Sequence, residues 1–430
     1  MVICLIFTII ICLLCLFRPV WGVIIIAAFI QYMAHLGAGI PGQKMYYITS
    51  FVAIVCVACY ALFRNRDIRK YPRWILWASV FNIICGLITD HQAYDPETNL
   101  VLANIATTYL FPIALWYVLY KKKDLNKYIK ITIIVSILAI LGVIPEIICG
   151  HNYVTDFEQN SLQVEDFMID AETVRFGIKR TNSIFSYFTT FGTFCMFTSF
   201  FFFCLKYVYG IKKIWKVNTT FLSLALFLFG FTTGSRAVIL ALFILIIICM
   251  RSRYFNQKIS KAKIFLILFL TSPILIPVTY QMVDSIVHSD TTEYAQGSST
   301  EMRQEQLDAC LEYLGQSPVW GNGRLYMWNY VKPTHPELLG AESVWFQLIV
   351  DFGIMGCVGY LFIIFACAWE LYKVRKLYGI LPFAYLAITS FSPDTGIQLN
   401  MLICMTLVLI KCDKFLIPII AKQHAHSLIH

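Results

Sequence analysis

Charged side chains are scarce in this chain. Asp, Glu, Lys and Arg together make up 14% of its 430 residues, while hydrophobic residues make up 59%. A soluble domain is about a quarter charged, and a water-soluble protein of this length could not withdraw so much apolar surface from water. The low charge therefore excludes a soluble globular protein, and the high hydrophobic content excludes a disordered chain. The composition predicts a protein that lies partly in lipid.

Sequence motifs for nucleotide and metal chemistry are also missing. The chain has no G-x-x-x-x-G-K-[ST] loop, no Rossmann glycine pattern and no H-E-x-x-H, and its 8 histidines are scattered. No RNA- or DNA-binding motif accompanies the net charge of +9, so we expect no nucleic-acid partner. In a membrane protein an excess of Lys and Arg usually sets the orientation instead.

Cysteine is plentiful, with 15 residues, but most of these lie in apolar runs, where the thiol behaves as a small hydrophobic group. Cys56 and Cys59 form a C-x-x-C on an expected membrane helix, without the βαβ pattern of a redox motif. Cys149 and Cys310 are both expected outside the membrane, which leaves a disulfide between them open. The apolar N-terminus has no positively charged leader and predicts a first membrane segment, not a removed signal peptide.

Long apolar runs fill most of the sequence. A bilayer core needs about twenty apolar residues per helix. The sequence therefore predicts an all-α, polytopic membrane helix bundle of about 12 to 13 transmembrane helices, within a single integral membrane domain of residues 1–430. The predicted spans are residues 2–17, 19–37, 45–63, 74–89, 100–120, 131–149, 183–209, 218–234, 235–250, 264–283, 342–369, 380–391 and 398–411. Residues 342–369 exceed one crossing and are expected to begin as a helix at the surface.

Basic residues cluster on alternate connectors between these spans. The basic connectors are residues 64–70, 121–123, 206–216, 251–263 and 373–376. Strict alternation places all of them on one side, which is cytoplasmic by the positive-inside rule. The opposite side carries most of the acidic residues and is expected to face the periplasm or the exterior.

Two connectors on the outer side are long, residues 150–182 and 284–341. Loops of that length tend to be functional or disordered. Within the second loop, residues 301–314 predict an amphipathic helix that lies flat on the outer mouth of the bundle, with a stripe formed by Leu307, Cys310, Leu311 and Leu314. Arg303 lies at the end of this stripe and is expected to face the membrane domain.

Three arginines stand out on the otherwise acidic outer side. Arg236 lies in Thr-Thr-Gly-Ser-Arg-Ala between two apolar runs, where an arginine near membrane depth is costly and is usually paired or functional. Arg180 lies at a similar boundary, and Arg303 is the third. The alternative for each is an interfacial or amphipathic-helix anchor. If the three converge on one mouth, they would suit a diphosphate, since guanidinium groups bind phosphate oxygens bidentately.

Glu342 opens an apolar segment at the outer boundary. An acid at a helix N-terminus is favoured by the helix dipole, which is one interpretation. A carboxylate there could also act as a general base toward a sugar hydroxyl. The loop before it holds His335 and four aromatic residues that could stack on sugar rings or anchor the loop at the interface: Trp320, Tyr326, Trp328 and Tyr330.

Four stretches resemble the O-antigen ligase and polymerase family of bacterial surface-glycan enzymes. They are Arg180-Thr-Asn-Ser-Ile-Phe-Ser-Tyr-Phe, Thr233-Gly-Ser-Arg-Ala, Arg303 followed by Ser317-Pro-Val-Trp-Gly-Asn-Gly323, and Glu342 to Gly356, which ends in Asp351-Phe-Gly-Ile-Met-Gly. The resemblance implies an inverting glycosyl transfer on the outer face of the bacterial cytoplasmic membrane, with no metal or cofactor. The donor would be a glycan on undecaprenyl diphosphate.

The resemblance also implies roles for the candidate residues. Arg180, Arg236 and Arg303 would hold and neutralise the departing diphosphate, and Glu342 would orient or deprotonate the acceptor hydroxyl. Trp320, Tyr326, Trp328 and His335 would be the sugar-binding residues.

One departure separates the activities within this family. Family ligases typically carry His-Asn where this chain has Glu342-Ser343, and Glu-Ser resembles the polymerase members better. The resemblance thus favours a polymerase with lipid-linked glycan as donor and acceptor, in contact with membrane lipid and with a chain-length regulator and a flippase as further partners.

Three other functions are alternatives to a polymerase. A ligase would move finished glycan to a lipid or protein acceptor. A lipid-glycan transporter would often bury charges mid-span and show two similar halves, whereas here the spans carry few such charges and no halves repeat. A non-catalytic scaffold would not need three arginines at one mouth.

Overall fold

The computed structural model of the protein describes residues 2–33, 36–40, 43–64, 71–154, 174–175, 178–185, 187–251, 280, 300–335, 343–392 and 397–427. Nearly all regular structure in these residues is helical, and the strands form only two short hairpins. The predicted all-α class is confirmed.

The N-terminal half of the described chain contains α1 (Val2–Phe17), α2 (Pro19–Ala28), η1 (Ile30–Met33), α3 (Met45–Arg64), α4 (Arg73–Gln92), α5 (Thr98–Asn104), η3 (Ile105–Leu110), α6 (Phe111–Val118), α7 (Lys122–Cys149), β1 (Val174–Arg175), β2 (Ile178–Lys179) and α9 (Phe188–Tyr207). The C-terminal half contains β3 (Lys213–Ile214), β4 (Val217–Asn218), α10 (Thr219–Phe231), α11 (Arg236–Arg251), α14 (Thr300–Leu314), η5 (Met327–Val331), α15 (Lys332–Thr334), α16 (Val344–Val374), η6 (Tyr378–Ile380), α17 (Leu381–Ser390) and α18 (Ile397–Ser427).

Five helical stretches among the described residues are long and apolar enough to cross a membrane: Arg73–Gln92, Thr98–Val118, Lys122–Cys149, Phe188–Tyr207 and Val344–Val374. Shorter apolar helices stand at most of the other predicted spans. These helices confirm a polytopic membrane bundle. The predicted span 264–283 lies outside the described residues, apart from Tyr280, and so does the basic connector 252–263.

The core of the bundle is built around α9. Its phenylalanine-rich sequence places large side chains on every face, and Phe191, Phe194, Phe197 and Phe201 are fully buried. A helix that is hydrophobic all round is expected at the centre of a membrane bundle. Polar contacts join other helices: the Asn82 side chain on α4 donates a hydrogen bond to the Gly359 carbonyl on α16 at 2.8 Å.

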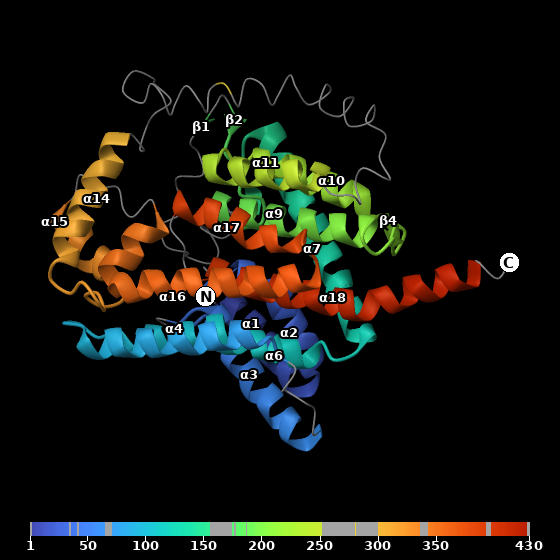
Figure 1. Ribbon diagram of the computed structural model, residues 1–430, viewed down its shortest axis with the longest axis horizontal. Helices are drawn as coiled ribbons and strands as arrows, with labels where there is room; N and C mark the ends of the chain where they lie inside the picture. The colour runs from blue at the N-terminus through green and yellow to red at the C-terminus, as the bar shows by residue number, and fades with distance from the viewer. Residues whose placement is uncertain are drawn as a thin grey trace.

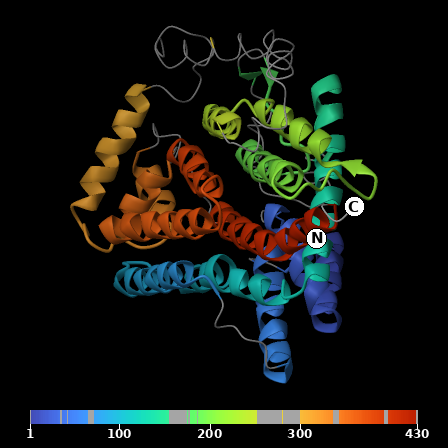
Figure 2. The same ribbon diagram turned by 45° about the vertical axis from the view of Figure 1, so that its right-hand side comes forward.

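Figure 1 shows α4, α10, α11 and α16 running along a common direction, while α14 crosses one end of them. Figure 2 shows the same relation from a second angle. The end at which α14 lies is called the α14 end below. The helix predicted at 301–314 thus lies across the mouth of the bundle as α14.

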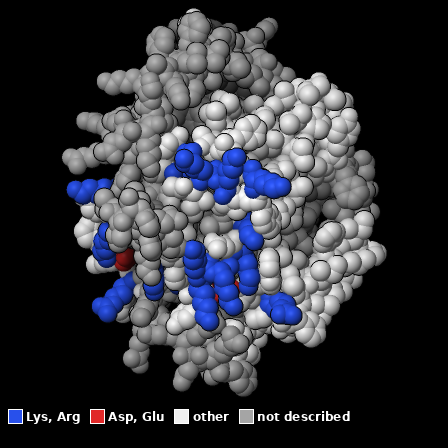
Figure 3. All heavy atoms as spheres, turned by 90° about the vertical axis from the view of Figure 1, so that its right-hand side faces the viewer, with Lys and Arg blue, Asp and Glu red and all other residues white. Residues whose placement is uncertain are grey.

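The opposite end carries the basic connectors. Figure 3 views this end directly and shows Lys and Arg side chains gathered over it. The exposed lysines of the elements at this end are Lys121 before α7, Lys122 and Lys123 in its first turn, Lys212, Lys213 and Lys216 around the β3–β4 hairpin, Lys373 near the end of α16 and Lys376 after it. This end is called the basic end below.

The long segment 342–369 is divided by a break. Its described part begins at Ser343, and α16 has one non-helical residue, Gly353, with φ 62° and ψ −159°. Residues 344–352 therefore form a separate helical arm before the longer part that follows Gly353, as the excess length predicted.

The 14 cysteines whose side chains the structure describes are free thiols. Cys149 is exposed and Cys310 is buried, and no disulfide joins them. Burial raises the pKa of the Cys310 thiol to about 12, and the nearby Asp351 carboxylate adds to the shift. Cys310 is therefore a packed core residue of the outer layer. Cys56 and Cys59 on α3 are free as well.

Candidate functional site

The segment that carries Arg180 is fixed by a buried carboxylate. Glu146, near the end of α7, is 1% exposed. Its two carboxylate oxygens accept the backbone N–H of Asn182 at 3.0 and 3.1 Å, and one of them also accepts the N–H of Ser183 at 2.9 Å. Ser183 has a positive φ of 57°, and its hydroxyl donates to the Ala139 carbonyl at 2.5 Å. These hydrogen bonds therefore fix the backbone conformation of the residues that follow Arg180.

The Arg180 side chain is buried against an aromatic ring. It is 7% exposed, and its guanidinium carbon lies 3.4 Å from the centre of the Phe188 ring, at the start of α9. A guanidinium over an aromatic face is stabilised by the ring quadrupole. Arg180 is thus held by packing, not extended as a surface anchor.

The Thr-Thr-Gly-Ser-Arg stretch is the turn between α10 and α11. Thr233 donates its hydroxyl to the Gly230 carbonyl at 2.8 Å. Gly234 has a φ of 60°, which is the left-handed conformation that only glycine adopts at little cost. Arg236 is the first residue of α11. The turn therefore delivers Arg236 to the N-terminus of a 16-residue helix.

Two bonds join the Arg180 segment to this turn. The Thr181 backbone N–H donates to the Thr232 carbonyl at 3.1 Å, and the two threonine hydroxyls share a hydrogen bond of 2.6 Å. Thr181 directly follows Arg180, and Thr232 precedes Arg236 by four residues. Two arginines that are far apart in the sequence are thereby brought to one place on the bundle.

Arg303 reaches the same end of the molecule from α14. Its guanidinium carbon lies 5.3 Å from the centre of the Phe391 ring, just after α17. α17 packs along α11, whose first residue is Arg236 (Figure 1). The prediction that Arg303 faces the membrane domain is confirmed.

The buried stripe of α14 differs from the predicted one. Gln306, Ala309 and Cys310 are buried, whereas Leu311 is 49% exposed. The helix is rotated because Cys310 packs into a small outer core formed with Met327, Val331 and Val350. The rotation follows from the loop and arm that cover α14, which hydrophobic periodicity alone does not reveal.

Glu342 lies outside the described residues. Its sequence neighbour Ser343 caps α16, accepting the Trp345 backbone N–H at 3.2 Å. The Trp345 indole N–H donates to the Ser390 hydroxyl at 3.1 Å, beside Phe391. The start of α16 is therefore attached to the same end of α17 that Arg303 contacts.

A backbone junction links the loop before α16 to the break in that helix. Asn322 and Gly323 donate their N–H groups to the carbonyls of Val350 and Asp351, both at 3.0 Å. A Cβ on Gly353 would lie 2.6 Å from the Gly321 nitrogen. Both glycines have positive φ. The two glycine motifs of the sequence thus form one close contact between backbones.

Asp351 completes this junction and was not predicted as a functional residue. It is fully buried, and its carboxylate accepts the backbone N–H groups of Leu325 and Met327 at 3.1 and 2.9 Å. A carboxylate held by backbone donors fixes the loop that carries the aromatic residues. An isolated acid inside an apolar run, eight residues after Ser343, was the available sequence signal.

The predicted sugar-binding residues fall into different environments. Tyr326 stacks on Tyr330, with ring centres 4.7 Å apart. Tyr313 joins Tyr326 to His335 through edge contacts, at 5.9 and 6.1 Å. Trp328 lies under the Lys332 ammonium, and the Trp320 carbonyl accepts the Thr89 hydroxyl on α4. Tyr326 and His335 are therefore brought together, while Trp320 and Trp328 lie apart from that cluster.

In the part of the chain that the structure describes, no group of three or more His, Cys, Asp or Glu residues is placed to bind a metal ion.

Residues 221–361 match the family model described as O-Antigen ligase. This part of the chain, about a third of its length, is therefore similar to the O-antigen ligase family. Members of this family are bacterial membrane enzymes of the glycosyltransferase type, and they act on lipid-linked glycan. No curated protein matches the chain.

The O-antigen ligase match holds most of the candidate site. It includes Arg236, Arg303, the glycine junction and the first half of α16. Arg180 precedes the matched residues, but the Thr181–Thr232 bonds attach its segment to them. The candidate site is therefore assembled across the boundary of the matched residues.

Proposed function

We propose that this chain polymerises oligosaccharide repeat units carried on undecaprenyl diphosphate. The reaction takes place at the α14 end of the bundle, which faces the periplasm or the exterior of the bacterial cytoplasmic membrane. It is an inverting glycosyl transfer that uses no metal. The product belongs to a surface polysaccharide, of the O-antigen, capsule or exopolysaccharide type.

The observation that carries the proposal is the bonding of Thr181 to Thr232. It holds two arginine segments together at the end of the bundle where α14 presents a third arginine. A diphosphate leaving group develops negative charge as its bond to the sugar breaks. Preorganised cationic donors at that point stabilise the transition state more than the ground state.

The position of Arg236 favours an anionic ligand. The N-terminus of a helix carries a partial positive charge, so a cation there is unfavourable and a bound anion is favourable. Arg236 begins α11. A phosphate at this helix end would interact with both the guanidinium and the helix dipole, which relieves the unfavourable placement of the arginine.

Each step of the proposed transfer has a residue that serves it. A hydroxyl of the acceptor sugar attacks C1 of the donor sugar, and the bond from C1 to the diphosphate oxygen breaks with inversion at C1. Arg180, Arg236 and Arg303 neutralise the departing diphosphate. Glu342 orients the acceptor and takes the proton of its hydroxyl. The growing chain remains on a lipid carrier.

Sugar recognition is assigned to the outer aromatic residues. The cluster of Tyr326 and His335 supplies ring faces beside α14, and Trp320 and Trp328 supply further ones on the same loop. Aromatic faces bind the apolar faces of sugar rings while leaving hydroxyl groups in water.

The orientation follows from charge. The basic end of Figure 3 is cytoplasmic under the positive-inside rule, which places the α14 end outside. A repeat unit must therefore be supplied there by a flippase, and a chain-length regulator is a natural further partner.

A ligase is the second candidate, because ligases share this domain. The Glu342-Ser343 pair favours the polymerase, since family ligases typically carry His-Asn there. The products that accumulate when the gene is deleted distinguish a polymerase from a ligase. Loss of a polymerase leaves single repeat units on the lipid carrier, whereas loss of a ligase leaves long chains on it. Long lipid-linked chains in the deletion strain would contradict the proposal.

A further inference from the structure

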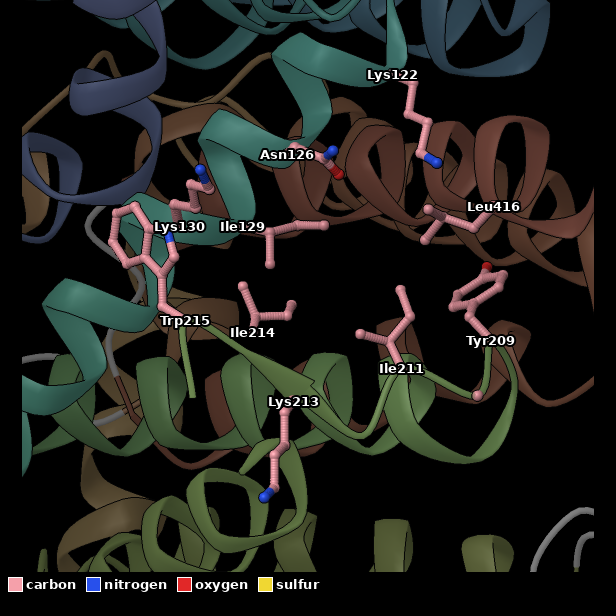
Figure 4. A pocket seen from close by; sticks show the side chains of 11 residues that line it. Lys122, Asn126, Ile129, Lys130, Tyr209, Ile211, Lys213, Ile214, Trp215 and Leu416 are labelled. Atoms are coloured by element: carbon pink, nitrogen blue, oxygen red, sulfur yellow. The ribbon is translucent and has the colours of Figure 1, made fainter. Parts of the chain in front are cut away.

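The basic end contains a cavity that the proposed reaction does not use. Its volume is about 480 Å³, which is within the range of small-molecule and lipid sites. It lies between the first turns of α7, the β3–β4 hairpin with the loop before it, and α18 (Figure 4). The lining residues are Lys122, Asn126, Ile129, Lys130, Tyr209, Gly210, Ile211, Lys213, Ile214, Trp215 and Leu416.

The lining has an apolar part and a cationic part. Figure 4 shows Ile129, Ile211, Ile214 and Leu416 pointing into the cavity, with Lys122 reaching toward it from the rim. Lysines supply three of the lining residues, and none of the residues that line it is acidic. Such a lining suits an amphiphile with an apolar chain and an anionic head, because each part meets its own kind of surface.

The nearby carboxylates are already paired with other cations. Asp124 on α7 binds Lys127 at 3.1 Å, and Asp413 on α18 binds Arg375 at 2.6 Å. Their charges therefore do little to offset the lysines at the rim. Figure 3 shows that the surrounding surface is also basic.

The hairpin on one wall of the cavity has a strained turn. β3 and β4 pair Ile214 with Val217, so Trp215 and Lys216 form a two-residue turn. Both turn residues have positive φ, 50° and 66°. This geometry normally takes Asn-Gly, and a residue other than glycine held there costs about 1 kcal/mol or more.

The strained turn leaves the Trp215 ring exposed beside α7. Trp215 is 54% exposed, and the Lys130 ammonium lies 4.7 Å from its ring centre. Tryptophan is enriched where lipid headgroups meet water.

We propose that this cavity binds an anionic phospholipid of the adjacent leaflet. Its phosphate interacts with Lys122 at the rim, Lys130 adds to the positive potential of the cavity, and part of an acyl chain fills the space lined by Ile129, Ile211 and Ile214. The site lies at the opposite end from the arginines, so it is separate from the proposed active site and does not depend on the polymerase assignment.

The test uses the full-length protein in a neutral detergent and measures its thermal midpoint against added lipid. Phosphatidylglycerol is expected to stabilise the wild type in a saturable manner, and phosphatidylcholine at equal concentration is not. The double variant Lys122→Gln/Lys130→Gln is expected to weaken the apparent affinity for phosphatidylglycerol about 30-fold, since each lysine near an anionic surface contributes about fivefold.

Two further variants make the result specific. Lys373→Gln/Lys376→Gln removes the same charge from the basic end outside the cavity and should leave the affinity within about twofold of the wild type. Ile211→Trp fills the apolar part while keeping every lysine, and it should also weaken binding. Native mass spectrometry should show phosphatidylglycerol retained by the wild type and lost in both cavity variants.

Three outcomes would overturn the proposal. Equal stabilisation by phosphatidylcholine would make the cavity a site for any acyl chain. Saturable stabilisation by inorganic phosphate alone, unaffected by Ile211→Trp, would make it a site for free anions. An equal loss of affinity in the Lys373/Lys376 variant would mean that general surface charge, not this cavity, attracts the lipid.

Discussion

At the residue scale, the binding of a diphosphate depends on how each arginine side chain is held. Arg180 is buried on Phe188, Arg236 begins α11, and Arg303 lies over Phe391. These are three different supports, and each limits the motion of a guanidinium before any ligand binds. A preorganised cation loses less entropy when it binds phosphate than a free surface arginine does.

Arg236 gives the first prediction. Replacement by Ala should lower the polymerisation rate by about 10²- to 10³-fold, as expected for loss of one preorganised charge donor. Replacement by Lys should lower it by at least about tenfold, because a single ammonium cannot reproduce a bidentate fork. Chain length on the lipid carrier, measured in cells with matched membrane levels of the protein, checks both.

Arg73 offers a matched control, since it is also the first residue of an apolar helix, but an exposed one. Arg73→Ala should polymerise at the wild-type rate. Full activity of Arg236→Lys would show that Arg236 acts only as a charge anchor.

Glu342 gives a prediction that rests on sequence alone. A general base typically contributes about 10²- to 10⁴-fold, whereas a helix-capping acid contributes only about 1 kcal/mol of local stability. Glu342→Gln keeps the size of the side chain but cannot accept the proton. The rate of purified protein on lipid-linked substrate should fall about a hundredfold at an unchanged thermal midpoint. A near wild-type rate would remove Glu342 from the mechanism.

At the scale of elements, the glycine junction supports the outer arm. Backbone bonds and two positive-φ glycines join the loop before η5 to the break in α16. The loop with its aromatic residues, α14 and the start of α16 therefore form one bonded and packed unit. The two glycine motifs that carry the family resemblance have this structural role. Their presence in the sequence is explained without any contact between the glycines and the arginines.

Gly353→Ala tests that role. The new Cβ would lie 2.6 Å from the Gly321 nitrogen, at a φ that Ala adopts only with strain of about 1 to 3 kcal/mol. We expect a lower thermal midpoint and lower activity together. Gly86→Ala on α4, where the nearest atom to a new Cβ is 4.0 Å away, should leave both unchanged. A wild-type midpoint for Gly353→Ala would show that the junction adds little to stability.

Much of the fold could be predicted from the sequence, because apolar runs long enough to span a bilayer identify membrane helices by length and composition alone. The position of Arg236 at the mouth followed from the two runs around it. The rotation of α14, which exposes Leu311, could not be predicted, since it depends on what covers the helix. The pairing of Thr181 with Thr232 and the burial of Asp351 likewise depend on contacts between segments far apart in sequence.

At the scale of the whole molecule, the account requires that the two ends lie on opposite sides of the membrane. Glu305 on α14 and Lys123 in the first turn of α7 are both exposed and mark the two ends. In intact spheroplasts, a membrane-impermeant thiol reagent should label Glu305→Cys and not Lys123→Cys, and lysis should expose the second. The background chain should carry Cys149→Ser, because Cys149 is itself exposed. Labelling of Lys123→Cys alone in intact cells would reverse the orientation.

The central claim is that this chain alone joins lipid-linked repeat units. The most direct measurement is the product of the purified protein, reconstituted in lipid vesicles and given only repeat units on undecaprenyl diphosphate, separated by length. The account predicts a ladder of lipid-linked chains, formed without a second acceptor or added metal, and absent with Arg236→Ala. Transfer that occurs only after a separate lipid or protein acceptor is added would contradict it.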